Sequence, residues 1–186
     1  VDGILKTSAG IQDDVLMTIM VWRIDANDFS GALDIARYAL MHKLSLPDRY
    51  QRTTACLLAE EFAEAAFRAR ATDSEINITC LIEVEKLTQA EDMPDQVRAK
   101  LHKALAYGLM TSQSKNEEYE CSAQASEDVT SRLENKKSAL THLRRAWQLH
   151  DKSGVKKDIE LLERAIKHAN RGSINNDMII PEDGVG

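Results

Sequence analysis

The chain has 186 residues, of which 43% are hydrophobic, 5% aromatic and 29% charged, and its formal net charge is -6. That length can bury a core without disulfides or metals, so a stapled mini-protein is excluded. With only 3 prolines and 8 glycines, the composition is typical of a helical protein and disfavours disorder, collagen and a β-sandwich.

The first predicted helix covers the apolar run that begins at Val15. Its side chains are apolar nearly all round as far as Ile24, which predicts a helix at the centre of the fold. Asp13 and Asp14 precede this run, where negative charge complements the helix dipole and caps free N–H groups. We therefore interpret this acidic pair as a helix start.

Three more helices and the start of a fifth are predicted before residue 111. Asp28 is a good N-cap for the second helix, whose apolar side chains recur at helical spacing over residues 29–40. A third helix is predicted over Thr54–Ala71 and a fourth from a Ser74 cap to Leu87. Pro94 stands where a first-turn proline belongs, followed by the apolar face of a fifth helix.

The C-terminal part changes character twice. Residues 111–137 are polar, which predicts an insertion or an exposed helix. Helical periodicity returns with a stripe of Leu140, Leu143 and Trp147, and after a break at Ser153-Gly154 a final helix follows. We expect a helical core over residues 1–170, with the polar insertion at about 111–137 and a C-terminal tail at 171–186.

A weak internal repeat supports the fold class. Ala32-Leu33 and Ala39-Leu40 have the same seven-residue separation as Ala139-Leu140 and Ala146-Trp147. Small alanines at this spacing let helices approach closely. The sequence predicts an all-α array of about seven helices in antiparallel hairpins, partly tetratricopeptide-like, although the Trp-x-x-Leu-Gly pattern of that repeat is absent.

Two groups of acidic residues have the composition of a nuclease site. Asp13-Asp14 could hold Mg²⁺ in a nuclease, and Pro94-Asp95 with Glu134-Asn135-Lys136 has the elements of a PD-(D/E)-x-K site. That site needs a strand framework, which the helical pattern lacks. Neither a P-loop nor a Gly-x-Ser-x-Gly elbow occurs. We predict no catalytic residues and leave open whether the chain is an enzyme.

Metal and cofactor sites have no support in the sequence. The five histidines include no i, i+4 pair and no companion cysteine, so we predict no metal, no cofactor, and surface or helix-end positions for His42, His102, His142, His150 and His168. The three cysteines, Cys56, Cys80 and Cys121, are odd in number and widely spaced. They are typical of core thiols in a reducing compartment.

No membrane partner is expected. The longest apolar run, residues 15–22, is broken by Thr18 and is shorter than the ~20 residues of a membrane span. No signal peptide is visible.

Positive charge gathers near the C-terminus. Residues 136–171 contain ten Lys/Arg against four Asp/Glu, a net charge of +6, which leaves -12 for the remainder. Such a stretch could neutralise phosphates, or could be a solvated helix face, since Asp158 and Glu160 interrupt it. The candidate DNA-binding residues are Arg144, Arg145, Lys152, Lys156, Lys157, Arg164 and Lys167.

Several blocks of residues resemble the GpM family of phage terminase small subunits. They are Gln12–Thr18, Trp22-Arg23, Gly31–Leu40, Asp92–Lys103 and Ser153–Glu160. The resemblance covers residues 3–169 except 111–137, a segment that is longer here than in the family.

The resemblance implies a component of the DNA-packaging motor of tailed phages, acting in the host cytoplasm. Such a subunit recognises the cohesive-end packaging site in phage DNA and recruits the large ATPase/nuclease subunit. The family is labelled an endonuclease subunit and is typically a ring-like homo-oligomer. Family members carry a segment ahead of the position of Val1, which leaves two expected places for the DNA-binding element, there or in the basic C-terminal helices.

Three hypotheses follow. The first is a non-catalytic packaging adaptor, and the second is a tetratricopeptide-like protein-interaction scaffold without DNA binding. The third is a metal-dependent nuclease that uses Asp13 and Asp14.

Overall fold

The computed structural model describes residue 3 and residues 10–114 and 125–176, and within these ranges the regular structure is entirely helical. The helices are α2 (Asp14–Asp25), α3 (Phe29–Met41), α4 (Thr54–Ala71), α5 (Ile78–Thr88), α6 (Asp95–Ser114), α7 (Ala125–Leu149) and α8 (Lys156–Asn176). The all-α prediction is confirmed, whereas the tetratricopeptide assignment stays a prediction.

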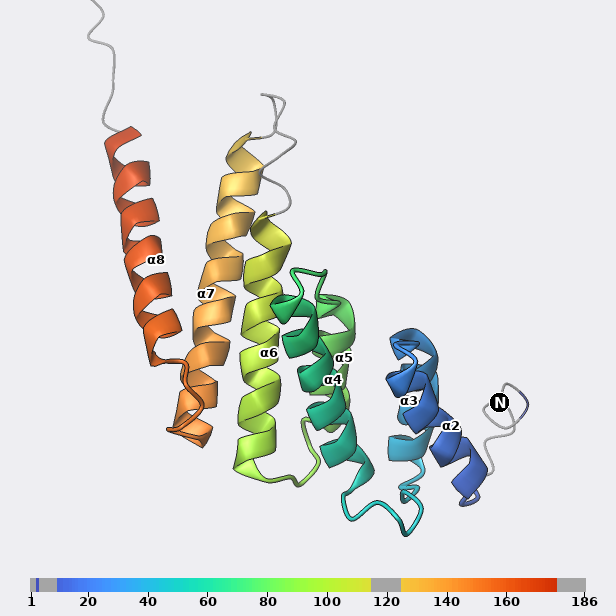
Figure 1. Cartoon of the computed structure of the whole chain (residues 1–186). Helices are drawn as coiled ribbons and strands as arrows, with labels where there is room; N and C mark the ends of the chain where they lie inside the picture. The colour runs from blue at the N-terminus through green and yellow to red at the C-terminus, as the bar shows by residue number, and fades with distance from the viewer. Residues whose placement is uncertain (1–2, 4–9, 115–124, 177–186) are drawn as a thin grey trace, which may run out of the picture.

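The helices form a row in which neighbours along the chain pack together (Figure 1). The pair α2–α3 lies at one end, α4 and α5 pack on α6 in the middle, and α7 connects α6 to α8 at the other end. Among the described helices, none is both long enough and apolar enough to cross a membrane.

The predicted central position of the first helix is wrong, because α2 lies at the edge of the row (Figure 1). One side packs inward, with Leu16 and Met20 almost fully buried. The other side has no described helix over it, so Val15 is 69% and Trp22 63% exposed. The all-round apolar pattern therefore reflects a buried face and an exposed apolar face.

Helix starts follow capping chemistry. The carboxylate of Asp13 accepts hydrogen bonds from the N–H groups of Val15 and Leu16, and that of Asp28 accepts one from Gly31, so both predicted starts are confirmed. These bonds satisfy donors that a helix leaves free.

The predicted Ser74 cap is wrong. The Ser74 hydroxyl is hydrogen-bonded to that of Thr72, and its N–H donates to the Ala69 carbonyl, so it belongs to the turn that ends α4. Asn77 caps α5 instead, because its side-chain oxygen accepts from the Cys80 N–H at 3.1 Å.

The later boundaries differ in detail from the expected ones. Pro94 lies one residue before α6, and its carbonyl accepts from the N–H groups of Val97 and Arg98. The polar segment is helical as far as Ser114 and again from Ala125, while residues 115–124 lie outside the described ones. Helix α8 continues to Asn176, past the expected start of the tail, and residues 177–186 are not described.

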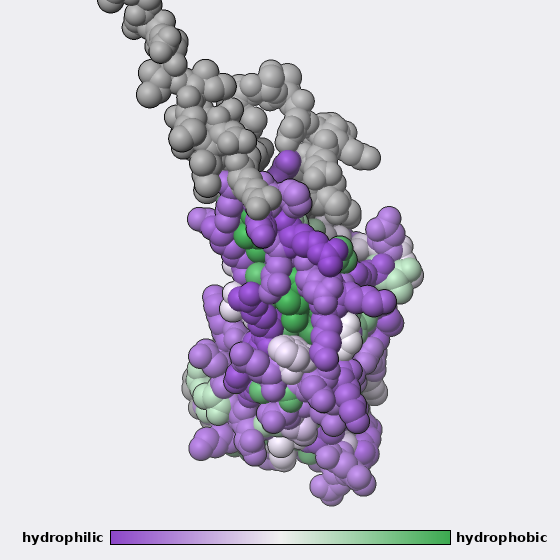
Figure 2. Space-filling view, turned by 90° about the vertical axis from the view of Figure 1, so that its left-hand side faces the viewer, coloured by the Kyte–Doolittle hydropathy of each residue, from purple (hydrophilic) through white to green (hydrophobic). Residues whose placement is uncertain are grey.

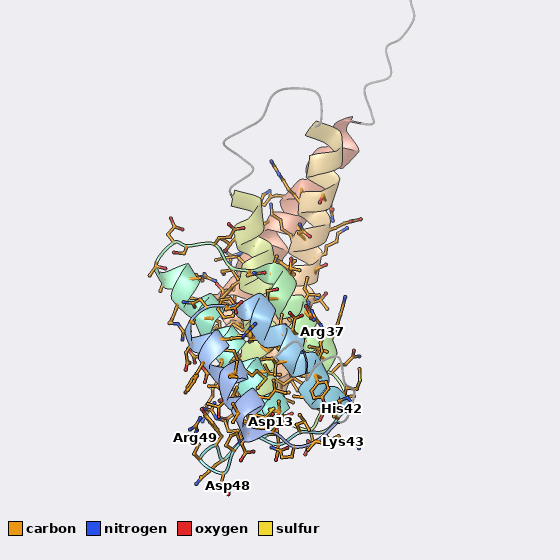
Figure 3. All side chains as sticks on the ribbon, turned by 90° about the vertical axis from the view of Figure 1, so that its right-hand side faces the viewer. Asp13, Arg37, His42, Lys43, Asp48 and Arg49 are labelled. Carbon is orange, nitrogen blue, oxygen red and sulfur yellow. The ribbon has the colours of Figure 1, made fainter. Side chains whose placement is uncertain are left out.

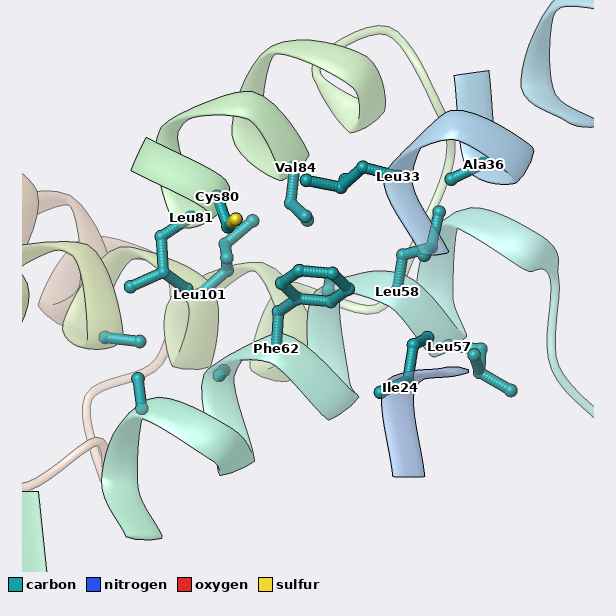
Figure 4. Close-up of a cluster of buried hydrophobic side chains, with 14 of the residues drawn as sticks. Ile24, Leu33, Ala36, Leu57, Leu58, Phe62, Cys80, Leu81, Val84 and Leu101 are labelled. Carbon is teal, nitrogen blue, oxygen red and sulfur yellow. The ribbon is translucent and has the colours of Figure 1, made fainter. Parts of the chain in front are cut away.

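The core centres on α4. Leu58 and Phe62 project from it toward Leu33 of α3 and Val84 of α5, and Leu101 of α6 completes the cluster (Figure 4). The alanines at positions 32, 36 and 39 are fully buried, so this face of α3 packs against the core. Two of the predicted core thiols, at positions 56 and 80, are free and buried, whereas Cys121 lies outside the described residues.

Candidate nucleic-acid interface

All seven candidate DNA-binding cations lie on the C-terminal hairpin, and all are exposed. They come from α7, the loop at 150–155 and α8, namely Arg144 and Arg145, Lys152, then Lys156, Lys157, Arg164 and Lys167. Figure 2 shows the side of the molecule on which α8 lies, a mostly hydrophilic surface with a narrow hydrophobic strip. The sequence stretch thus forms one structural unit.

Two of the seven cations are held by carboxylates of α8. Arg144 donates to Glu163 at 2.8 Å, and Arg164 lies 3.5 Å from Glu160. These pairs are exposed, so each contributes about 1 kcal/mol or less to stability. Their main effect is to reduce the positive charge that the hairpin offers to a phosphate.

Four cations have no ion pair within the described part of the chain. They are Arg145, Lys152, Lys157 and Lys167, which we call the open cations. The seventh candidate, Lys156, has its Nζ atom 5.4 Å from the centroid of the Trp147 ring. The open cations are the members best placed to neutralise phosphates.

The neighbouring arginines of α7 point in different directions. Arg144 faces α8 through its pair with Glu163, whereas Arg145 is close enough to His102 of α6 to help lower the pKa of that ring. The hairpin therefore carries positive charge on more than one side.

A groove of about 430 Å³ lies between α7 and α8, lined by Arg144, Trp147, Gln148, Lys156, Ile159, Glu160 and Glu163. Trp147 is 43% exposed, so its predicted place in the buried stripe with Leu140 and Leu143 is wrong. The adjacent Ala146 takes the buried position, and one residue further along a helix turns the side chain by about 100°.

The N-terminal helices pair their arginines more completely. Arg23 lies 3.3 Å from Asp28, Arg37 contacts both Asp34 and Glu83, and Arg52 contacts Glu60 and Glu61. The hydrogen bond to Glu83 also raises the pKa of Arg37. Figure 3 shows this end of the molecule, with Arg37 on α3. These three arginines are thus neutralised by carboxylates, in contrast to the open cations of the hairpin.

Two histidines form a pair that the sequence did not reveal. The Nδ1 atoms of His102 on α6 and His142 on α7 are 3.0 Å apart, so one ring donates a hydrogen bond to the other. Burial, then the neighbouring His142, lowers the pKa of His102 to about 4, and burial also lowers that of His142. The expected surface or helix-end positions are wrong for these two residues, which lie 40 positions apart in the sequence.

The residues proposed for a nuclease serve as parts of helices. Asp13 caps α2, Asp95 begins α6, and Glu134 lies within α7. The described residues contain no group of three or more His, Cys, Asp or Glu that could hold a metal ion.

Comparison with known proteins identifies relatives. A family model described as phage small terminase subunit matches residues 1–96. The terminase endonuclease subunit of Escherichia phage P2 is 42% identical over 167 residues, which cover 90% of this chain. The chain spans 59% of the length of that relative, and no solved structure matches. Since the family model covers more than half of it, the chain belongs to the phage small terminase subunit family.

Proposed function

We propose that this chain is the DNA-recognising subunit of a phage DNA-packaging motor. It binds the cohesive-end packaging site through the C-terminal hairpin and recruits the large ATPase/nuclease subunit in the host cytoplasm. The observation that carries the DNA-binding part is the group of open cations on α7, the following loop and α8, whereas Arg37 and Arg52 at the other end are paired with carboxylates.

The proposal places DNA cutting in the large subunit. The acidic pair in this chain, Asp13 and Asp14, opens α2, and Asp13 uses its carboxylate to cap two backbone N–H groups. A carboxylate that is engaged in this way has a structural role. Mg²⁺-dependent cleavage by the isolated chain that disappears in Asp13→Ala would instead support the nuclease hypothesis.

Replacing the four open cations with glutamine is expected to lower the affinity for duplex DNA. It should also make that affinity less dependent on salt concentration. Each lost phosphate contact makes the slope of log K against log[salt] shallower by about 0.9. The measurement is a binding titration at several salt concentrations. The matched control replaces four exposed cations on other elements, Lys43, Arg49, Arg68 and Lys86, with the same change in net charge. Equal weakening by both variants would show that net charge, and not the hairpin, drives binding.

We also propose that the chain forms a homo-oligomer through the exposed face of α2. Val15 and Trp22 lie seven residues apart on that helix, so they share a face, and both are more than 60% exposed. Large apolar side chains gathered on one surface are typical of interaction sites.

The double variant Val15→Ser, Trp22→Ser is expected to have a lower molar mass in solution, because the contact loses its apolar area. Light scattering measures this mass. Met41→Ser is the control, since Met41 is 77% exposed at the end of α3. Unchanged mass in the double variant, with the wild type oligomeric, would move the interface elsewhere.

A second candidate function is a protein-interaction scaffold without DNA binding. The groove between α7 and α8 supports it, because an exposed indole and Ile159 lie beside two cations and two carboxylates. Such a mixture suits a peptide better than a phosphate backbone. DNA titration separates the two candidates.

A further inference from the structure

A second cationic site lies outside the predicted cluster, where α4 meets α6. A pocket of about 390 Å³ is lined by Phe67, Arg70 and Ala71 of α4 and by Lys103 and Tyr107 of α6. The guanidinium carbon of Arg70 lies over the Tyr107 ring, 3.5 Å from its centroid, and the Lys103 Nζ atom is 5.8 Å from the same centroid. Two cations therefore gather around one ring.

These cations are held in place but remain able to bind an anion. A guanidinium stacked on a ring keeps its N–H donors in its own plane, and most of them stay available at its edge. Lys103 donates one hydrogen bond, to the Ser153 carbonyl at 2.7 Å, and an ammonium group has three donors. Neither residue has an ion pair with a carboxylate in the part of the chain that the structure describes.

The site is continuous with the open cations of the hairpin. The bond from Lys103 to Ser153 joins it to the loop that carries Lys152. The Tyr107 hydroxyl donates to the Asp158 carboxylate at 2.9 Å, which brings it to the first turn of α8, next to Lys157. Asp158 adds one opposing charge there.

The ring itself adds no negative charge at neutral pH. Burial, together with the hydrogen bond to Asp158, raises the pKa of Tyr107 to about 12. The phenol therefore stays neutral, and it anchors Arg70 without competing with an incoming anion. Anchoring reduces the side-chain entropy that binding would otherwise cost.

We infer that Arg70 and Lys103 form a subsite for a phosphodiester group of the DNA backbone. The inference rests on the proposed DNA binding and deepens it, because it extends the contact from the hairpin onto α4 and α6. A strand that passes the α7–α8 loop would meet Lys152 or Lys157 and then Lys103 and Arg70. The contact is to phosphate, so it carries no base specificity.

Arg70→Gln tests the subsite, with Arg68→Gln as its matched control. Both arginines are exposed in the last turn of α4, and both changes remove one charge, but Arg68 lines a different pocket. Titration with duplex DNA at several salt concentrations is expected to give a slope shallower by about 0.9 for Arg70→Gln. Arg68→Gln should keep the wild-type slope, and Arg70→Lys, which keeps the charge, should also keep it. Circular dichroism checks that each variant is folded.

The outcomes separate this inference from the proposed function. If the wild type binds and the open-cation variant loses salt dependence while Arg70→Gln does not, the subsite is overturned and the hairpin interface stands. If the wild type fails to bind DNA at low salt, the proposed function falls and the subsite with it.

Discussion

Leu58→Ala is expected to lower the free energy of unfolding by about 2–5 kcal/mol, the range for a buried leucine that leaves a cavity. Leu58 is fully buried on α4, in the cluster that also contains Phe62 and Leu33 (Figure 4). Since the side chain is fully buried within the core, relaxation can fill only part of the cavity. Chemical denaturation with helicity as the signal measures the change.

Leu161→Ala is the control for this prediction. Its side chain is 58% exposed on α8, so the same chemical change should alter stability by about 0.5 kcal/mol or less. Equal losses in the two variants would contradict the burial of Leu58 at the centre of the core.

Acidification is expected to destabilise the fold through the histidine pair. The folded pKa of His102 is about 4, below the ordinary value of 6.5, because of burial and then the charges of His142, Arg145 and Arg98. The unfolded chain therefore takes up a proton near pH 6.5, while the folded chain takes it up only near pH 4. The free energy of unfolding should fall over that window, by at most about 1.4 kcal/mol per pH unit for one proton.

His102→Gln should remove that part of the pH dependence. The measurement compares the drop in unfolding free energy between pH 7 and pH 5 in the wild type and in the variant. The His142 ring faces the same contact, and Glu85 acts on it in the opposite direction, so His142→Gln should give a smaller effect of the same sign. An identical pH dependence in the wild type and His102→Gln would contradict the buried pair.

Local structure could be predicted where one residue type decides it. The caps at Asp13 and Asp28 followed from a short polar side chain before an apolar helical run, and the third helix was expected with its observed bounds, Thr54–Ala71. The prediction that Ser74 caps the fourth helix was wrong, because Asn77, three residues later, offers the same capping chemistry nearer to the apolar run.

Tertiary position could not be predicted from periodicity. The pattern of α2 predicts two apolar faces, but it does not indicate that only one of them would be covered by other helices. In α7, likewise, the pattern does not indicate that Ala146 would be buried and the neighbouring Trp147 exposed. The candidate cations were found because they are close in sequence. The contacts between His102 and His142 and between Arg70 and Tyr107 join different helices, at separations that no local pattern encodes.

Recognition of the packaging site within this chain is tested most directly by one titration at two salt concentrations. The purified chain is mixed with labelled duplex from the end of the phage genome and with a scrambled duplex of equal length. Our account predicts tighter binding to the genome end, weakened by salt for both duplexes, because phosphate contacts release counterions. Equal affinity for the two duplexes, or no binding at the lower salt, would contradict it.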